Sequence, residues 1–145
     1  MRDLSDRKNI EAEFPAGREA DGAKPRVLLM EHDAAVLDST RLLLKAAGYT
    51  VVTAISAAEA HQKADQVCFD LLVVDDYGLE AGETGDRVIA SLRAKLGAGL
   101  KAILVTGDAS SALKSMHTDR NLRVVSEPLE AERLLALLTE LLADR

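Results

Sequence analysis

The sequence predicts an α/β protein built on a doubly wound, five-stranded parallel sheet in the order 2-1-3-4-5. Three observations support this fold class. Short apolar runs alternate with longer segments whose apolar residues recur at helical spacing. Polar residues follow several of the short runs, as at the ligand-binding edge of a parallel sheet. The 145 residues, 48% of them hydrophobic, are enough for one domain with a buried core.

Ordered structure is expected to begin after Pro25. Residues 1–25 mix both signs of charge with Gly and Pro and show no sustained periodicity, which is typical of a flexible extension or linker. Residues 26–145 are expected to form the domain.

The first strand is expected over residues 26–30, a short apolar run. Asp33 then stands at a helix N-cap position, and apolar residues at helical spacing follow it. Gly48 is expected to end this helix. Residues 49–53 are rich in β-branched side chains and predict the second strand.

The middle of the chain predicts two helices and the central strand. Ser56 and Glu59 have the spacing of a capping box and open a helix that ends near Gln66. The third strand is the run at 71–74, four apolar residues that lead directly into two aspartates. Residues 84–96 then predict a helix with one apolar face.

The last part of the chain predicts two more strands and two more helices. Strands are expected over residues 101–106 and 122–125, and a proline follows the second of them. The segment 110–116 is a helix with a poor apolar stripe. Residues 131–142 form a leucine-rich helix. Alternating strands and helices of this kind predict right-handed crossovers, with helices on both faces of the sheet.

Polar residues stand at the ends of the first, third and fourth strands: Glu31–Asp33, Asp75–Asp76 and Thr106. These strands are neighbours at the switch point of the predicted sheet, so we expect their ends to converge in one crevice. Clustered carboxylates raise one another's pKa unless a cation offsets their charge. Open, oxygen-rich sites of this kind suit Mg²⁺.

Composition excludes several classes of function. The formal net charge of −6 argues against a nucleic-acid-binding surface, and 3% aromatic residues argue against base-stacking platforms. Cys68 is the one cysteine, which excludes an internal disulfide and fits a reducing compartment. No segment has the length or apolar character of a membrane span or signal peptide. We therefore expect a cytoplasmic protein that binds neither membranes nor, by itself, nucleic acid.

The chain resembles the receiver domain of two-component response regulators, which has a flavodoxin-like fold, over residues 26–142. Val27–Asp33 is similar to the first strand and acidic cluster of that family. The stretches Asp76–Leu79 and Gly82–Gly85 resemble the phosphoacceptor strand end and its loop, especially in receivers of hybrid sensor kinases. Ile103–Asp108 is similar to the fourth strand and its switch threonine, and Glu127 precedes a proline where the family has Lys-Pro.

The resemblance implies a phosphoacceptor domain rather than an enzyme. A histidine kinase or phosphotransfer protein would pass a phosphoryl group to one aspartate while Mg²⁺ is bound, and positioning and electrostatics would carry the reaction. A homodimer is compatible with this role. The positions that correspond to the acidic metal pocket are Glu31, His32, Asp76 and the backbone of Gly78. The switch positions are Thr106 and Val124.

Two aspartates compete for the phosphoacceptor position. If Gly85 is aligned with the end of the family's ten-residue Asp-Tyr loop, the phosphoacceptor position falls on Asp76. If Asp70 is instead aligned with the acidic residue that the family commonly has before this strand, the phosphoacceptor position falls on Asp75. We prefer Asp76 because a surface connection before the strand absorbs an extra residue easily.

Three positions depart from the family pattern. His32 replaces a carboxylate that binds Mg²⁺, and imidazole suits Zn²⁺ better, although we interpret His32 as an exposed loop residue. Glu127 replaces the lysine that contacts the phosphoryl group, which reverses a charge. Val124 replaces a residue that is often aromatic, so output by an aromatic flip is not expected. We therefore expect Mg²⁺ binding weaker than millimolar and slow phosphorylation.

Three functions remain open from the sequence. The first is a receiver phosphorylated inefficiently at Asp76. The second is a phosphorylation-independent pseudo-receiver that acts as a protein-binding module. The third, a flavodoxin-like cofactor protein, is disfavoured because a Ser/Thr-rich phosphate loop is missing and aromatic residues are scarce.

Overall fold

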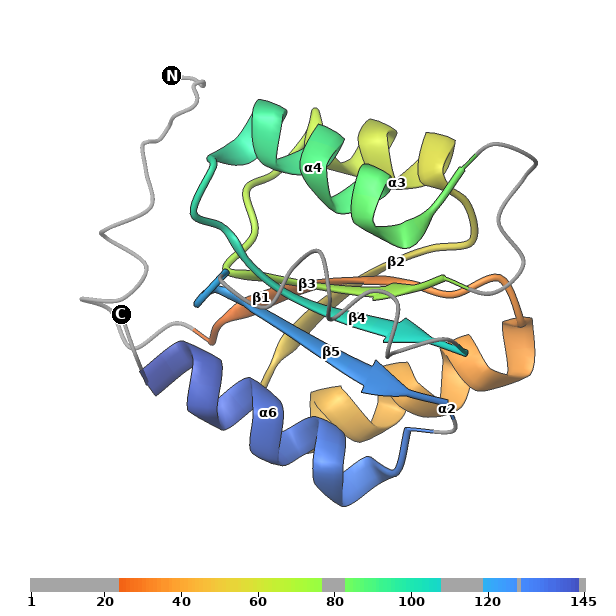
Figure 1. The fold of residues 1–145 in the computed structure, drawn as a ribbon. Coiled ribbons are helices and arrows are strands. Elements are labelled where there is room, and N and C mark those ends of the chain that lie inside the picture. Colours follow the sequence, from red (N-terminus) through yellow and green to blue (C-terminus); the bar gives the residue numbers. More distant parts are fainter. Residues whose placement is uncertain (1–23, 77–82, 108–118, 128, 144–145) are drawn as a thin grey trace.

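A five-stranded parallel sheet lies between two layers of helices, in the strand order β2-β1-β3-β4-β5 (Figure 1). The predicted fold class is therefore confirmed. This computed structural model describes residues 24–76, 83–107, 119–127 and 129–143. The strands are β1 (Arg26–Met30), β2 (Thr50–Ala54), β3 (Leu71–Asp75), β4 (Lys101–Thr106) and β5 (Leu122–Ser126). The helices are α2 (Ala34–Ala46), α3 (Ala57–Ala64), α4 (Gly85–Leu96) and α6 (Ala131–Ala143).

Two expected segments cannot be compared with the structure. The helix expected over residues 110–116 and residues 1–23 of the expected N-terminal extension lie outside the described residues.

The ends of α2 follow the expected capping chemistry. The Asp33 side chain accepts hydrogen bonds from the backbone N–H groups of Ala35 and Val36, at 2.9 and 3.2 Å. Gly48 follows the helix with a φ of 105°, a left-handed conformation that glycine adopts without a Cβ clash.

The capping box of α3 is made in a modified form. The Ser56 hydroxyl accepts the N–H of Glu59 at 3.1 Å, but the Glu59 carboxylate accepts the N–H of Ile55, at 2.7 Å, rather than that of Ser56. The helix ends at Ala64, two residues before the expected end at Gln66, because the chain turns there through hydrogen bonds to the Lys63 carbonyl.

Strand alternation divides the core into two clusters, one on each face of the sheet. Leu72, Val74 and Leu104 pack with residues of α3 and α4. Val73, Val105 and Val125 pack with residues of α2 and α6 on the other face. Figure 1 shows the same division, with α3 and α4 above the sheet and α2 and α6 below it. This alternation decides where each functional side chain lies.

Candidate functional site

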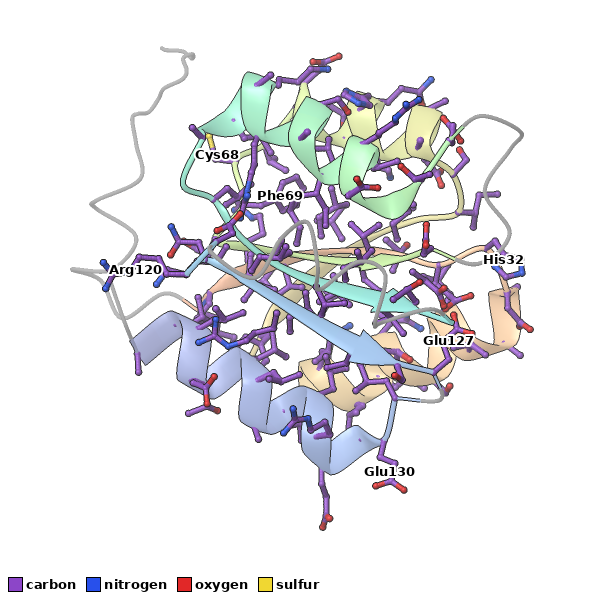
Figure 2. All side chains as sticks on the ribbon, viewed as in Figure 1. His32, Cys68, Phe69, Arg120, Glu127 and Glu130 are labelled. Atoms are coloured by element: carbon purple, nitrogen blue, oxygen red, sulfur yellow. The ribbon has the colours of Figure 1, made fainter. Side chains whose placement is uncertain are left out.

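The candidate site lies at the carboxyl edge of the sheet. Figure 2 shows His32 and Glu127 at this edge, whereas Cys68, Phe69 and Arg120 lie at the opposite end of the strands. The backbone continues the strand pairing here, because the N–H of Asp76 donates to the Val105 carbonyl at 2.8 Å and that of Glu127 to the Thr106 carbonyl at 3.1 Å. The strand ends are therefore held at fixed positions relative to one another.

Asp76 faces the α3/α4 side of the sheet and both of its carboxylate oxygens are hydrogen-bonded. Oδ2 accepts the hydroxyl proton of Thr106 at 3.0 Å, and Oδ1 accepts the backbone N–H of Gly85 at 2.5 Å. Gly85 is the first residue of α4, and the N-cap residue Thr84 makes no side-chain cap hydrogen bond. Asp76 therefore supplies the anionic cap of α4 from a neighbouring strand.

Three carboxylates lie together on the α2/α6 side of the sheet: Glu31, Asp75 and Glu127. Glu31 is only 6% exposed, and its Oε2 accepts the N–H of Asp33 at 3.0 Å. The side chains of Glu31 and Glu127 both form hydrogen bonds with the side chain of Asp75. A hydrogen bond between two carboxyl groups requires a proton, so this cluster retains protons above the usual range of acidic residues.

The pKa values of Glu31 and Glu127 are both raised by burial and by the neighbouring carboxylates. Burial, the hydrogen bond with Asp75 and the charges of Asp75 and Asp33 raise the pKa of Glu31 to about 8, against a smaller opposing effect of the Asp33 N–H. Burial, the hydrogen bond with Asp75 and the charges of both aspartates raise the pKa of Glu127 to about 7. At neutral pH the cluster is therefore less negative than its composition suggests.

The expectation of one crevice shared by Glu31, His32, Asp76 and Thr106 needs correction. Asp75, rather than Asp76, lines a pocket with Glu31 and His32, while Asp76 lies with Thr106 on the other face. The reason is that successive side chains of a strand point to opposite faces, so adjacent aspartates at the end of β3 are separated by the sheet. Glu127 lines the pocket with Glu31 and Asp75, and the charges of both aspartates contribute to its raised pKa.

The remaining predicted site residues have mixed outcomes. His32 is exposed, as expected, and its Nδ1 lies 3.3 Å from Glu31 Oε2. Val124 is partly buried against the α3/α4 cluster. Gly78 lies outside the described residues.

The described acidic residues do not fit a preformed magnesium site. Within residues 24–76, 83–107, 119–127 and 129–143, no group of three or more His, Cys, Asp or Glu side chains is arranged to hold a metal ion. The Glu31 side chain instead forms a hydrogen bond with the Asp75 side chain, and the raised pKa of Glu31, about 8, keeps its proton in place at neutral pH. A cation would have to displace that proton before it could bind there.

Gly85 is a site residue whose contact with Asp76 was not predicted from the sequence, where it served only to set the alignment of the loop. A Cβ placed on Gly85 would collide with the buried Leu104 side chain and would lie 3.1 Å from Asp76 Oδ1. Only glycine therefore allows α4 to begin this close to the aspartate. A glycine nine residues after an aspartate in the sequence could have indicated this contact.

We expect Gly85→Ala to destabilise the fold by about 1–3 kcal/mol, because the added methyl group overpacks the contact with Leu104 and disturbs the cap made by Asp76. Urea unfolding measures this change. Gly107→Ala is the matched control, since a Cβ there meets nothing within 4 Å. Equal losses in the two variants would contradict the close approach at Gly85.

Comparisons with known proteins identify the fold. The chain matches the response regulator receiver domain protein (CheY-like) from Methanospirillum hungatei JF-1 with 28% identity and a TM-score of 0.72, over 84% of this chain and 96% of that one. It matches the chemotaxis protein CheY4 of Vibrio cholerae with 23% identity and a TM-score of 0.72, over 82% and 99%. The adenylate cyclase from Rhodopirellula baltica matches with 21% identity and a TM-score of 0.72, over 83% and 88%.

The chain thus has the CheY-like receiver fold, which is consistent with two-component signalling. No family model matches the sequence, and no curated protein matches it. Among the helices that the structure describes, none combines the length and apolar character needed to cross a bilayer.

Proposed function

We propose that this protein is a two-component signalling receiver in which Asp76 accepts a phosphoryl group slowly from a histidine kinase or phosphotransfer protein. The observation that carries the proposal is the hydrogen bond from the Thr106 hydroxyl to Asp76 Oδ2, 3.0 Å long. It joins the aspartate at the end of β3 to the threonine at the end of β4, the pair that the resemblance assigns to phosphorylation and switching. The sequence of the loop that follows Asp76 also resembles the loops in receivers of hybrid sensor kinases.

Slow uptake follows from the charges around Asp76. A phosphoryl group carries close to two negative charges, so it requires a nearby cation. Glu127 occupies the position at which the resemblance expects lysine, and its pKa is raised by burial and by both aspartates. Phosphorylation would add further negative charge to a group of residues that already holds protons to limit its own repulsion.

A second function is favoured by the proton-sharing cluster itself. The side chains of Glu31 and Glu127 both form hydrogen bonds with the side chain of Asp75, which links the ends of three strands. A receiver fold held in one state by such contacts would act as a phosphorylation-independent module that binds a protein partner. This alternative predicts no phosphoryl uptake by the native chain.

Intact-mass measurement after incubation with acetyl phosphate and Mg²⁺ tests the proposal. We expect a small fraction of the chain to gain one phosphoryl group, and Asp76→Asn to abolish the gain. Asp75→Asn is the matched control, since it removes one carboxylate from the adjacent position while leaving the hydrogen bonds of Asp76 in place. Loss of the gain in Asp75→Asn alone would transfer the role to Asp75, and no gain in the native chain would favour the binding module.

Weak Mg²⁺ binding is part of the same proposal. His32 supplies no negative charge, and Glu31 keeps its proton to about pH 8, so the hard cation meets too few anionic oxygens at neutral pH. We expect a dissociation constant above millimolar in an NMR titration at pH 7. Binding should strengthen as the pH rises to 9, where Glu31 loses its proton. Submillimolar binding at pH 7 would contradict this expectation.

A further inference from the structure

Helix α2 exposes large apolar side chains. Among the residues that the structure describes, three such side chains are exposed, and two of them lie on α2: Val36, at 46%, and Leu42, at 53%. The neighbouring helix below the sheet, α6, has the same length but turns its apolar residues inward (Figure 1). Leu44 is buried in α2, whereas four leucines are buried in α6: Leu134, Leu137, Leu138 and Leu141. Exposed apolar surface of this kind often marks a contact with another protein.

The exposed residues of α2 form a regular stripe. Four of them follow one another at spacings of four, three and four residues: Ala35, Ser39, Leu42 and Ala46. At 3.6 residues per turn, this outer stripe covers an arc of about 60°, roughly opposite the buried Leu44. The Ser39 hydroxyl donates to the carbonyls of Ala35 and Val36, at 3.1 and 3.2 Å. It can therefore be covered by another surface without losing a hydrogen bond.

The outer stripe is symmetric about its midpoint. A two-fold axis between residues 40 and 41 would place a second α2 helix antiparallel to the first. Ala35 would then lie opposite Ala46 of the second copy, and Ser39 opposite Leu42 of the second copy. Small side chains would face small or large ones, so the two helices could approach closely. A two-fold contact requires this kind of self-complementary surface.

The two flanks of the outer stripe differ in chemistry. Asp38 and Lys45 lie on one flank, and Val36 and Leu43 lie on the other. In an antiparallel pair each flank meets the same flank of the second copy, so Asp38 would meet Lys45 of the second copy twice. Asp38 binds Arg41 of its own helix through Oδ1, at 2.6 Å, and Oδ2 can accept from that lysine. In a parallel pair the charged flank would face the apolar one, so charge complementarity favours antiparallel pairing.

We propose that this protein forms a weak homodimer through the outer stripe of α2, with the two helices antiparallel. One helix face buries less than the roughly 1,600 Å² of a standard protein interface. Because interfaces of standard size bind with micromolar affinity or better, we expect a dissociation constant weaker than about 1 µM. Asp76 and Thr106 lie on the other side of the sheet, so this contact does not depend on phosphoryl transfer.

Sedimentation velocity of the full chain between about 10 µM and 1 mM tests the proposal. We expect the mean mass to rise with concentration from that of one chain toward that of two. A chain that stays monomeric up to the highest concentration would overturn the proposal.

Two glutamate substitutions provide a matched pair of variants. Leu42→Glu places a charge within the outer stripe, and we expect it to weaken dimerisation at least about tenfold. Ile55 is also exposed, at 57%, but lies between β2 and α3, so Ile55→Glu should leave the dissociation constant within about twofold. Both side chains are exposed, so both variants should fold. Equal weakening in the two variants, or none in Leu42→Glu, would overturn the proposed surface.

Charge variants test the antiparallel arrangement. Asp38→Lys and Lys45→Asp each turn both contacts between these positions into repulsions, so each variant alone should dimerise about tenfold more weakly than the native chain. A mixture of the two variants restores opposite charges at both contacts. We expect the mixture to form a heterodimer about tenfold tighter than either variant forms with itself. A mixture without this preference would overturn the antiparallel pairing.

Discussion

The double variant Glu127→Lys/His32→Asp is expected to gain phosphoryl groups from acetyl phosphate faster than the native chain and faster than either single variant. Two unit charges about 4 Å apart interact with roughly 1 kcal/mol in water and about 4 kcal/mol at an effective dielectric constant of 20. If Glu127 were fully ionised, replacing it by lysine would remove a repulsion from the phosphoryl group and add an attraction of the same size. The two changes together would stabilise the phosphorylated state by roughly 2 to 8 kcal/mol.

The raised pKa of Glu127 reduces this estimate. With a pKa of about 7, the side chain is partly neutral at neutral pH, and an adjacent phosphoryl group would favour its protonation further. Proton uptake removes most of the repulsion, so the main gain in the variant is the attraction supplied by lysine. We therefore expect an increase between about fivefold and a thousandfold, which corresponds to roughly 1 to 4 kcal/mol.

The single variants separate the two contributions. His32→Asp alone adds a carboxylate to a cluster that already shares protons, so we expect little gain or a loss. Glu127→Lys alone should give part of the increase, and the excess in the double variant measures the coupling between the two positions. Glu130→Lys is the charge-matched control, because Glu130 is exposed and points away from the sheet (Figure 2).

Two outcomes would contradict this account of slow phosphorylation. Robust labelling of the native chain would show that the two departures do not limit uptake. A double variant that gains phosphoryl groups no faster than the native chain would also show that the residues at positions 32 and 127 do not limit uptake.

The free energy of unfolding is expected to fall as the pH rises from about 5 to 8. Glu31 and Glu127 have ordinary pKa values near 4.5, and in the fold these values rise to about 8 and about 7. In this pH range the folded state therefore binds more protons than the unfolded state, and stability decreases with pH. The contribution is fully present below about pH 4.5 and is lost as the pH passes through the folded-state values.

Urea unfolding across this pH range measures the slope. We expect roughly 2 to 3 kcal/mol per pH unit near pH 6, since each of the two protons held only by the folded state contributes about 1.4 kcal/mol per unit. Glu127→Gln should flatten the slope because it removes one of the two groups, whereas Glu130→Gln, at an exposed position outside the cluster, should leave it unchanged. A slope of the opposite sign in the native chain would contradict proton sharing by the cluster.

Local patterns in the sequence were sufficient to predict the fold class and most elements. Apolar runs and helical periodicity predicted each described strand and helix, and the cap made by Asp33 followed from side-chain chemistry that acts within four residues. Such interactions are local, so they can be recognised in a single sequence. Element ends were less secure, as the early end of α3 shows, because competing hydrogen bonds decide them.

The composition of the site could be predicted from the sequence only in part. Strand ends indicated which carboxylates gather at one edge of the sheet, and Glu127 was recognised by its place before a proline. The sequence did not reveal which of Asp75 and Asp76 faces α2 and α6, because that assignment depends on which face of β3 packs against these helices.

Tertiary structure alone decided how the acidic residues satisfy one another. The bond between Thr106 and Asp76 joins residues 30 positions apart, and the contact of Glu31 and Glu127 with Asp75 joins the ends of three strands. The sequence determined the charges that this protein brings to the edge of its sheet. Packing determined which of them share a proton, because pKa values depend on burial and on distances of a few ångströms that only the folded chain sets.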